Sequence, residues 1–159
     1  MRKTCRRKVW PLVDPIRSAL EGAAITDTAI LDRVRMTELQ ALEAFRTGQA
    51  TKPDWDAMAD LCNVSETMSR QGIGPEAMES CARAQVALGQ VHQRYARQGR
   101  IGTTGPELEA LREAFRWHDA QRSSVARSVY EQAIKETGDR IRSAHPSGKV
   151  LLPVHRERA

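Results

Sequence analysis

Apolar side chains recur at steps of three and four residues along most of this chain, which is the spacing of one face of an α-helix. Between residues 28 and 46 this stripe is formed by Ile30, Leu31, Val34, Leu39, Leu42 and Phe45. No segment shows sustained two-residue alternation bounded by hairpin turns, which is the pattern that predicts strands. The spacing therefore predicts an all-α fold.

Helix start and stop signals divide the chain into five expected helices. Thr51 and Asp54 are placed to cap the start of the third, and Gly99 is a natural stop for the fourth. The expected helices are 15–21, 28–46, 51–70, 75–98 and a last, longest one from 106 past 135 towards 142. Short loops between them predict a single-domain helical bundle of about four long helices plus a short N-terminal one.

The bundle is expected to occupy residues 11–143, between two segments of different character. Residues 1–10 form a basic N-terminal arm, and residues 144–159 form a C-terminal tail. The tail contains an apolar run, Val150 to Val154, between charged ends. A segment of this kind docks either on the body of its own chain or on a partner.

Cysteine content and hydropathy indicate a cytoplasmic protein. Cys5, Cys62 and Cys81 are too few and too scattered for a disulfide framework, so a reducing compartment fits best. Pro11 and Asp14 interrupt the stretch that would follow a signal peptide's basic start. No apolar run approaches the length of a membrane span, and we expect no membrane association.

Positive charge points towards an anionic partner. The net charge is +5, carried mainly by arginine, whose planar fork suits phosphate. The candidate nucleic-acid-binding residues are the arm's Arg2, Lys3, Arg6, Arg7 and Lys8, extended by Arg94, Arg97 and Arg100. The alternatives are surface charge that serves solubility, a solvated terminus, and cations that counter the dipole at a helix C-terminus.

Residues 58–70 resemble a bacterial helix-turn-helix, in which Asn63 would stand at the turn. The candidate DNA-reading residues are Ser65, Glu66, Thr67, Ser69 and Arg70. The spacing after Val64-Ser65 is one residue short of the usual pattern, and Gly72 ends the segment early. A single continuous helix from residue 53 to residue 70 is the alternative interpretation.

No catalytic motif is present. The chain contains no GxSxG or HExxH motif, and its glycine-rich loops lack the lysine of a phosphate-binding loop. His92 and His118 fall on the inward faces of two expected helices, where they could meet at a metal or be hydrogen-bonded core residues. With no third ligand at helical spacing, we expect no metal site, no cofactor and no enzymatic activity.

Three segments resemble the small helical accessory proteins of proteobacterial phages and plasmids. They are MRKTCRRKVWPLVDPI, GIGPEAM and TGPELEALREAFRWHDAQRSS. The resemblance implies an accessory gene of a mobile element and carries no site residue with it. We expect a protein that binds nucleic acid or a nucleoprotein complex. The alternative is a protein–protein inhibitor of a host factor, such as a host-defence complex, without nucleic-acid contact, and a homodimer is compatible with either.

Overall fold

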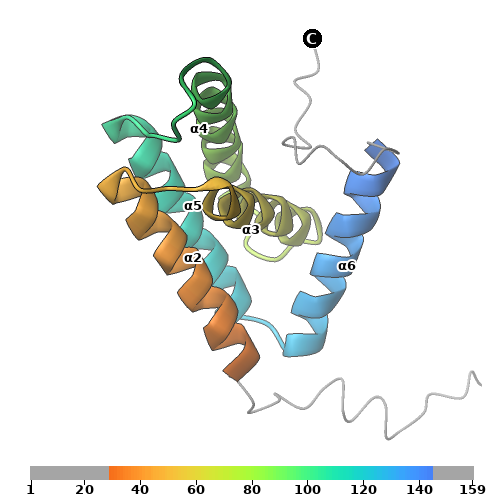
Figure 1. Cartoon of the computed structure of the whole chain (residues 1–159). Helices are drawn as coiled ribbons and strands as arrows, with labels where there is room; N and C mark the ends of the chain where they lie inside the picture. Colours follow the sequence, from red (N-terminus) through yellow and green to blue (C-terminus); the bar gives the residue numbers. More distant parts are fainter. Residues whose placement is uncertain (1–28, 145–159) are drawn as a thin grey trace, which may run out of the picture.

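The computed structural model describes residues 29–144, and every described element is a helix (Figure 1). The helices are α2 (Ala29–Thr47), α3 (Lys52–Arg70), α4 (Ala77–Gln98), α5 (Gly105–Ser123) and α6 (Arg127–Ala144). The all-α prediction is confirmed. The basic arm, the short helix expected at 15–21 and nearly all of the tail lie outside the described residues.

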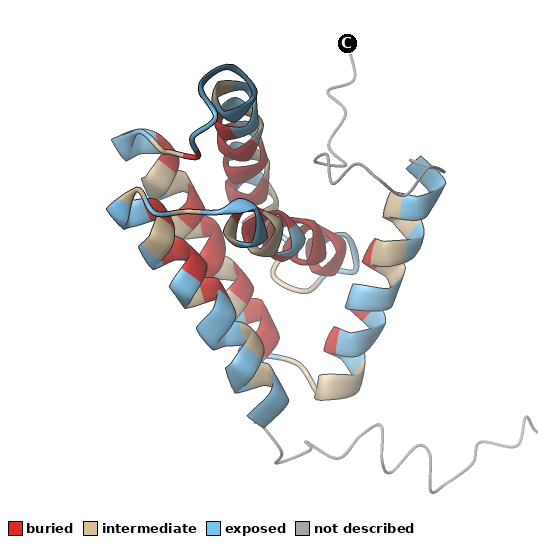
Figure 2. Ribbon diagram, viewed as in Figure 1, coloured by how far each residue is buried: buried red, intermediate tan, exposed pale blue. Residues whose placement is uncertain are grey.

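The centre of the bundle is α3, which packs against each of the other four helices (Figure 1). Twelve of its residues are buried, on all sides of the helix rather than along one stripe (Figure 2). Helices α2 and α5 lie side by side across it, and α4 packs on both α3 and α5. Because α3 is surrounded by the other helices, most of the polar side chains of its second half are buried as well as the apolar ones.

Aliphatic and aromatic side chains from α2 to α5 form the main core. Its largest members are Phe45, Trp55, Met58, Leu61, Leu88, Leu111 and Phe115. The indole Nε1 of Trp55 donates a hydrogen bond to the carbonyl oxygen of Leu88 at 3.0 Å. The large, low-polarity surface of Trp55 is thus buried with its one polar atom satisfied.

The predicted helix boundaries are confirmed where local capping chemistry sets them. The carboxylate of Asp54 accepts hydrogen bonds from the backbone N–H and the hydroxyl of Thr51 at the start of α3. Gly99 ends α4 in the left-handed conformation, with φ of 67°. Such caps use only neighbouring residues, so the sequence predicts them well.

The single long helix predicted from residue 106 towards 142 is wrong: it is two helices, α5 and α6. The break falls at residues 124–126, where the hydroxyl of Ser124 bonds the carbonyl oxygen of Gln121 and that of Ser123 bonds the carbonyl of Asp119. Hydroxyl bonds of this kind bend a helix only slightly, and Thr67 and Thr137 make them inside unbroken helices, so they accompany the break and do not account for it. After the break, α6 leaves α5 to pack on α3.

Helix α6 has few apolar contacts with the rest of the bundle. Tyr130 and Ala133 form a small second core with Val64 and Met68 of α3.

In the described part of the chain, no helix is both long enough and apolar enough to span a membrane.

Candidate nucleic-acid interface

The charge of this protein is unevenly distributed. Residues 29–144 contain sixteen Lys and Arg and sixteen Asp and Glu, so the helical body has no net formal charge. Residues 1–28 contribute +3 and residues 145–159 contribute +2. The whole surplus of +5 therefore belongs to the two terminal segments, and the arm's Arg2, Lys3, Arg6, Arg7 and Lys8 lie outside the described residues.

Most cations of the body are neutralised by ion pairs. Only four of its sixteen lysines and arginines lack an ion pair with another described residue, namely Arg33, Arg97, Arg100 and Lys135. Arg97 is exposed in the last turn of α4, and Arg100 is exposed two residues after the helix ends. These two guanidinium groups are available for an anionic partner.

Arg94, the third predicted cation of this region, has a structural role instead. Its guanidinium makes a two-pronged contact with the Glu107 carboxylate, at 2.8 and 2.5 Å, and also donates to the carbonyl oxygen of Gly102. The hydrogen bond to Glu107 raises the pKa of Arg94. Arg94 therefore joins the end of α4 to the start of α5.

A polar hollow of about 420 Å³ lies where α2 and α4 end and α5 begins. Its lining includes Arg46, Arg94 and Arg100 together with the backbone of residues 102–104. Arg46 is paired with Glu43, so Arg100 is the one lining cation without a carboxylate partner among the described residues. The hollow can accept a phosphate edge through Arg100, but it holds no concentrated positive charge.

The helix-turn-helix interpretation is wrong, and the continuous-helix alternative is confirmed. The helix α3 runs without interruption from Lys52 to Arg70, and no non-glycine residue in the described part, Asn63 included, has a positive φ. Four of the five candidate reading residues are buried: Ser65 0%, Glu66 1%, Thr67 0% and Ser69 5% exposed. These four side chains cannot reach the edges of DNA bases while the bundle is folded, and the fifth, Arg70, has a side chain 52% exposed that is paired with Glu66.

Several of these buried residues bond to Gln121 of α5. The Gln121 amide nitrogen donates to the Ser69 hydroxyl at 2.9 Å and to the carbonyl oxygen of Ile73 at 2.8 Å. Its amide oxygen accepts from the hydroxyl of Ser65 at 2.5 Å. One glutamine thus fixes the end of α3 and the following loop against α5.

Glu66 is the centre of a buried charge cluster. Arg70 and Arg140 both donate to its Oε1, at 2.7 and 3.0 Å, and Gln85 donates to its Oε2 at 3.0 Å. Burial opposes ionisation of Glu66, but the hydrogen bonds from Gln85 and Arg70 outweigh it and lower the pKa. The cluster joins α3, α4 and α6.

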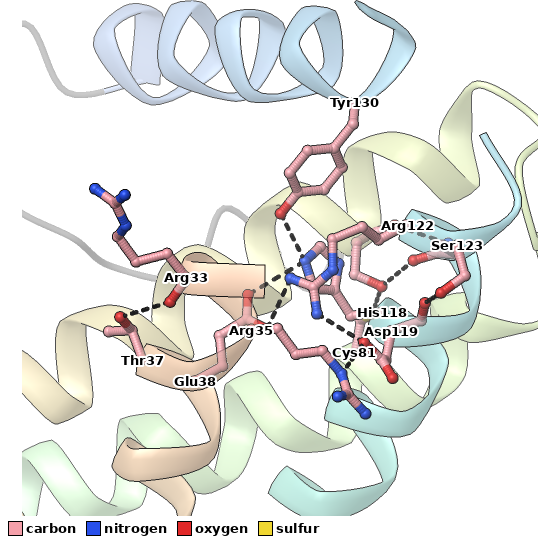
Figure 3. Close-up of polar contacts among 12 residues, drawn as sticks. Arg33, Arg35, Thr37, Glu38, Cys81, His118, Asp119, Arg122, Ser123 and Tyr130 are labelled. Carbon is pink, nitrogen blue, oxygen red and sulfur yellow. Dashed lines mark hydrogen bonds and ion pairs between the residues drawn. The ribbon is translucent and has the colours of Figure 1, made fainter. Parts of the chain in front are cut away.

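A second cluster joins α2, α5 and α6 (Figure 3). Arg122 donates to Glu38 at 2.9 Å and to Asp119 at 2.8 Å. The Nε2 atom of His118 shares a hydrogen bond of 3.0 Å with the hydroxyl of Tyr130. Arg35 also donates to Asp119, at 2.9 Å, so two carboxylates face two guanidinium groups and these four side chains carry no net formal charge. The cluster therefore has a structural role.

The two histidines singled out from the sequence have different environments. His118 is fully buried, and its Nε2 atom is hydrogen-bonded to Tyr130, whereas its Nδ1 atom has no hydrogen-bond partner among the described residues. His92 is exposed, which contradicts the inward face expected for it, and its ring lies 5.8 Å from that of Trp55. Within residues 29–144, no three His, Cys, Asp or Glu side chains are grouped to hold a metal ion.

Sequence reasoning missed the roles of Glu38, Glu66 and Gln121. Each lies on a helix, and each finds its decisive partners on other helices, as far as 84 residues away along the chain. The only local signal is the pair Glu66 and Arg70 at the four-residue spacing of a helical ion pair.

In comparisons with protein families, curated proteins and solved structures, nothing matches this chain.

Proposed function

We propose that this protein is a non-enzymatic accessory protein of a mobile element that binds nucleic acid or a nucleoprotein complex through its basic N-terminal arm. The observation that supports this proposal is the partition of charge. The helical body has no net formal charge, and the +5 surplus is confined to residues 1–28 and 145–159. A charge surplus that served solubility alone would have no reason to be confined to the terminal segments.

In this proposal the arm neutralises phosphates and the bundle occupies space beside them. Five cations within the first eight residues are enough to hold a nucleic-acid backbone without reading its sequence. Arg97 and Arg100 add a second contact on the body, because both are exposed and lack a carboxylate partner among the described residues. The protein then acts by covering a stretch of nucleic acid or part of a complex formed on it.

Fluorescence anisotropy with labelled single- and double-stranded DNA tests the proposal. If five arm cations release counterions from duplex DNA, a rise from 50 to 200 mM salt should weaken binding by about 10²–10³-fold. Replacing Arg2, Lys3, Arg6, Arg7 and Lys8 with glutamine should remove most of the low-salt affinity. If the protein does not bind DNA at low salt, or if its affinity does not change with salt concentration, phosphate neutralisation is contradicted.

The contribution of the body is tested with two matched pairs of substitutions. Arg97→Gln with Arg100→Gln should reduce the slope of log affinity against log salt by about 2. Arg33→Gln with Lys135→Gln removes two cations that also lack an ion pair with a described residue, but these lie on other helices, and it should leave the slope unchanged. Equal effects of the two pairs would show that net charge, and not a contact at the end of α4, is responsible.

A further inference from the structure

An apolar groove of about 410 Å³ runs between α2 and α6, and α3 forms its floor. Figure 1 shows α6 standing apart from α2, with α3 passing between them. The apolar lining residues are Val34, Ala57, Leu61, Val64, Ile134 and Ile141. Ile134 remains 44% exposed, so this wall of the groove is uncovered by the described residues.

The groove persists because polar bonds hold α6 at both of its ends. Tyr130 is fixed near the start of α6 by His118, and Arg140 is fixed near its end by Glu66 and Thr67. Apolar contact with α2 is limited, since Leu31 is the one α2 side chain packed against the small core around Tyr130 and Ala133. Removing exposed apolar surface of this kind from water is favourable, so a second apolar segment that covers the groove would stabilise the protein.

We infer that residues 150–154 of this same chain, Val-Leu-Leu-Pro-Val, occupy the groove. α6 ends at Ala144, and residues 145–149 include Pro146 and Gly148, which favour a reversal of the chain. The groove follows α6 from Ile141 back to Tyr130, which is about 16 Å at 1.5 Å per residue. Five extended residues span about 17 Å, so the apolar run matches the length of the groove.

Charge complementarity supports this occupant. The carboxylates that line the groove are Glu38 and Asp60. Glu38 is paired with Arg122, whereas Asp60 makes no ion pair or hydrogen bond with another described residue. Lys149 and Arg156 flank the apolar run on its two sides, and residues 145–156 contain no acidic side chain. A tail docked in the groove therefore brings two cations towards Asp60 at the edge of the groove floor.

The other apolar segment outside the described residues fits less well. Residues 9–21 also contain a run of apolar side chains, but Asp14 and Glu21 stand there against one cation, Arg17, so their net formal charge is −1. Residues 145–156 carry +2, which is the sign that Asp60 attracts. Charge thus favours the C-terminal segment over the N-terminal one.

The test uses the full-length chain with Leu151→Asp and Leu152→Asp together. The change should uncover the groove and raise the fluorescence of an apolar dye such as ANS several-fold. A labelled peptide of residues 145–159 should bind this double variant and reverse the dye signal, which an unfolded chain would not do. It should bind the wild-type protein at least tenfold more weakly, because a tethered tail has an effective concentration near the millimolar range.

Further variants distinguish three possible occupants of the groove, namely the C-terminal segment, the N-terminal segment and a second copy of the chain. In the double-variant background, Ile134→Asp should abolish peptide binding, whereas Val86→Asp, at an exposed apolar position of α4 outside the groove, should not. Leu12→Asp with Val13→Asp should leave the dye signal at the wild-type level. The inference is overturned if the N-terminal variant, and not the C-terminal one, uncovers the groove. It is also overturned if the double variant changes the oligomeric mass by light scattering without binding the peptide, which would assign the groove to a second copy.

Discussion

Glu66 shows how one side chain can fix the packing of three helices. It is 1% exposed, and its carboxylate accepts hydrogen bonds from Arg70, Gln85 and Arg140. Removing an acid of this kind leaves buried donors unpaired and costs more than the hydrogen bonds themselves. The sequence offered no reason to expect this burial, because two of the three partners come from α4 and α6.

Glu66→Ala should therefore lower the free energy of unfolding by about 2–3 kcal/mol, as measured by urea denaturation. The matched control is Glu131→Ala, which removes another glutamate paired with an arginine four residues away, but with a side chain 55% exposed. That change should stay within about 0.5 kcal/mol of the wild-type protein. Similar losses in the two variants would mean that Glu66 acts as an ordinary surface charge.

Tyr130 provides a second test at the residue scale. Burial, assisted by the nearby charge of Glu38, raises the pKa of its phenol to about 12 from an ordinary value of 10.0. The folded protein therefore holds the phenolic proton more tightly than the unfolded chain does. The stability linked to this group is fully present below pH 10 and is lost as the pH rises towards 12.

A spectrophotometric titration of tyrosinate should show a late step in the wild-type protein, and Tyr130→Phe should remove it. The chain has only two tyrosines, so the difference between the two curves isolates Tyr130. A difference curve centred near pH 10 would contradict the burial of this hydroxyl.

At the scale of helices, what could be predicted from the sequence was whatever depends on close neighbours along the chain. The capping of α3 by Thr51 and Asp54 and the stop of α4 at Gly99 involve residues within one turn. The break between α5 and α6 was missed because the apolar spacing continues through it, from Phe115 in α5 through Val125 in the break to Val129 in α6. Periodicity alone does not separate one long helix from two helices whose apolar faces remain in phase.

The helix α6 should be the least stable element of the described part. Its apolar contacts are confined to a small cluster around Tyr130 and Ala133, and the rest of its attachment is polar. Elements with few buried apolar contacts open at lower free energy than the core. Native-state hydrogen exchange should therefore show the amides of α6 exchanging through an opening that leaves α3, α4 and α5 protected.

A variant makes this test specific. Tyr130→Ala should speed exchange in α6 by removing its largest buried side chain, with much smaller changes in α4. If α6 and α3 exchange with the same free energy, α6 is part of one cooperative unit with the core and the prediction is wrong.

At the scale of the whole molecule, the fold class was predictable but the arrangement was not. Helical apolar stripes and the absence of strand patterns are enough to indicate an all-α bundle. They do not reveal that α3 is surrounded, because Ser65, Thr67 and Ser69 are polar residue types that are usually exposed, yet all three are buried. The candidate interface was partly predictable as well: Arg97 and Arg100 are exposed as expected, whereas Arg94 is bound to Glu107, a partner thirteen residues away.

The same buried ion pairs predict how the stability of the whole bundle depends on acid. Burial opposes ionisation of Glu66, Glu107 and Asp119. Hydrogen bonds from neighbouring groups, which include at least one arginine at each carboxylate, outweigh burial and lower the three pKa values. A lowered pKa means that the folded state releases the proton more readily than the unfolded chain. The resulting stability is present at neutral pH and is lost as the pH falls below about 5 through the folded pKa values.

Asp60 works in the opposite direction: its side chain is exposed at the edge of the groove, but neighbouring protein atoms partly desolvate the carboxylate, and this together with the charge of Asp56 raises its pKa. Its protonation on acidification favours the folded state and offsets part of the loss. The urea concentration at the midpoint of unfolding should therefore decrease between pH 6 and pH 3 in the wild-type protein, and decrease more steeply in Asp60→Asn.

Glu107→Gln should have a lower midpoint than the wild-type protein at pH 6. Its midpoint should decrease less on acidification, because one of the three carboxylates with a lowered pKa is gone. A midpoint that stays constant or rises on acidification would show that these ion pairs contribute nothing to the folded state beyond what hydrated charges provide.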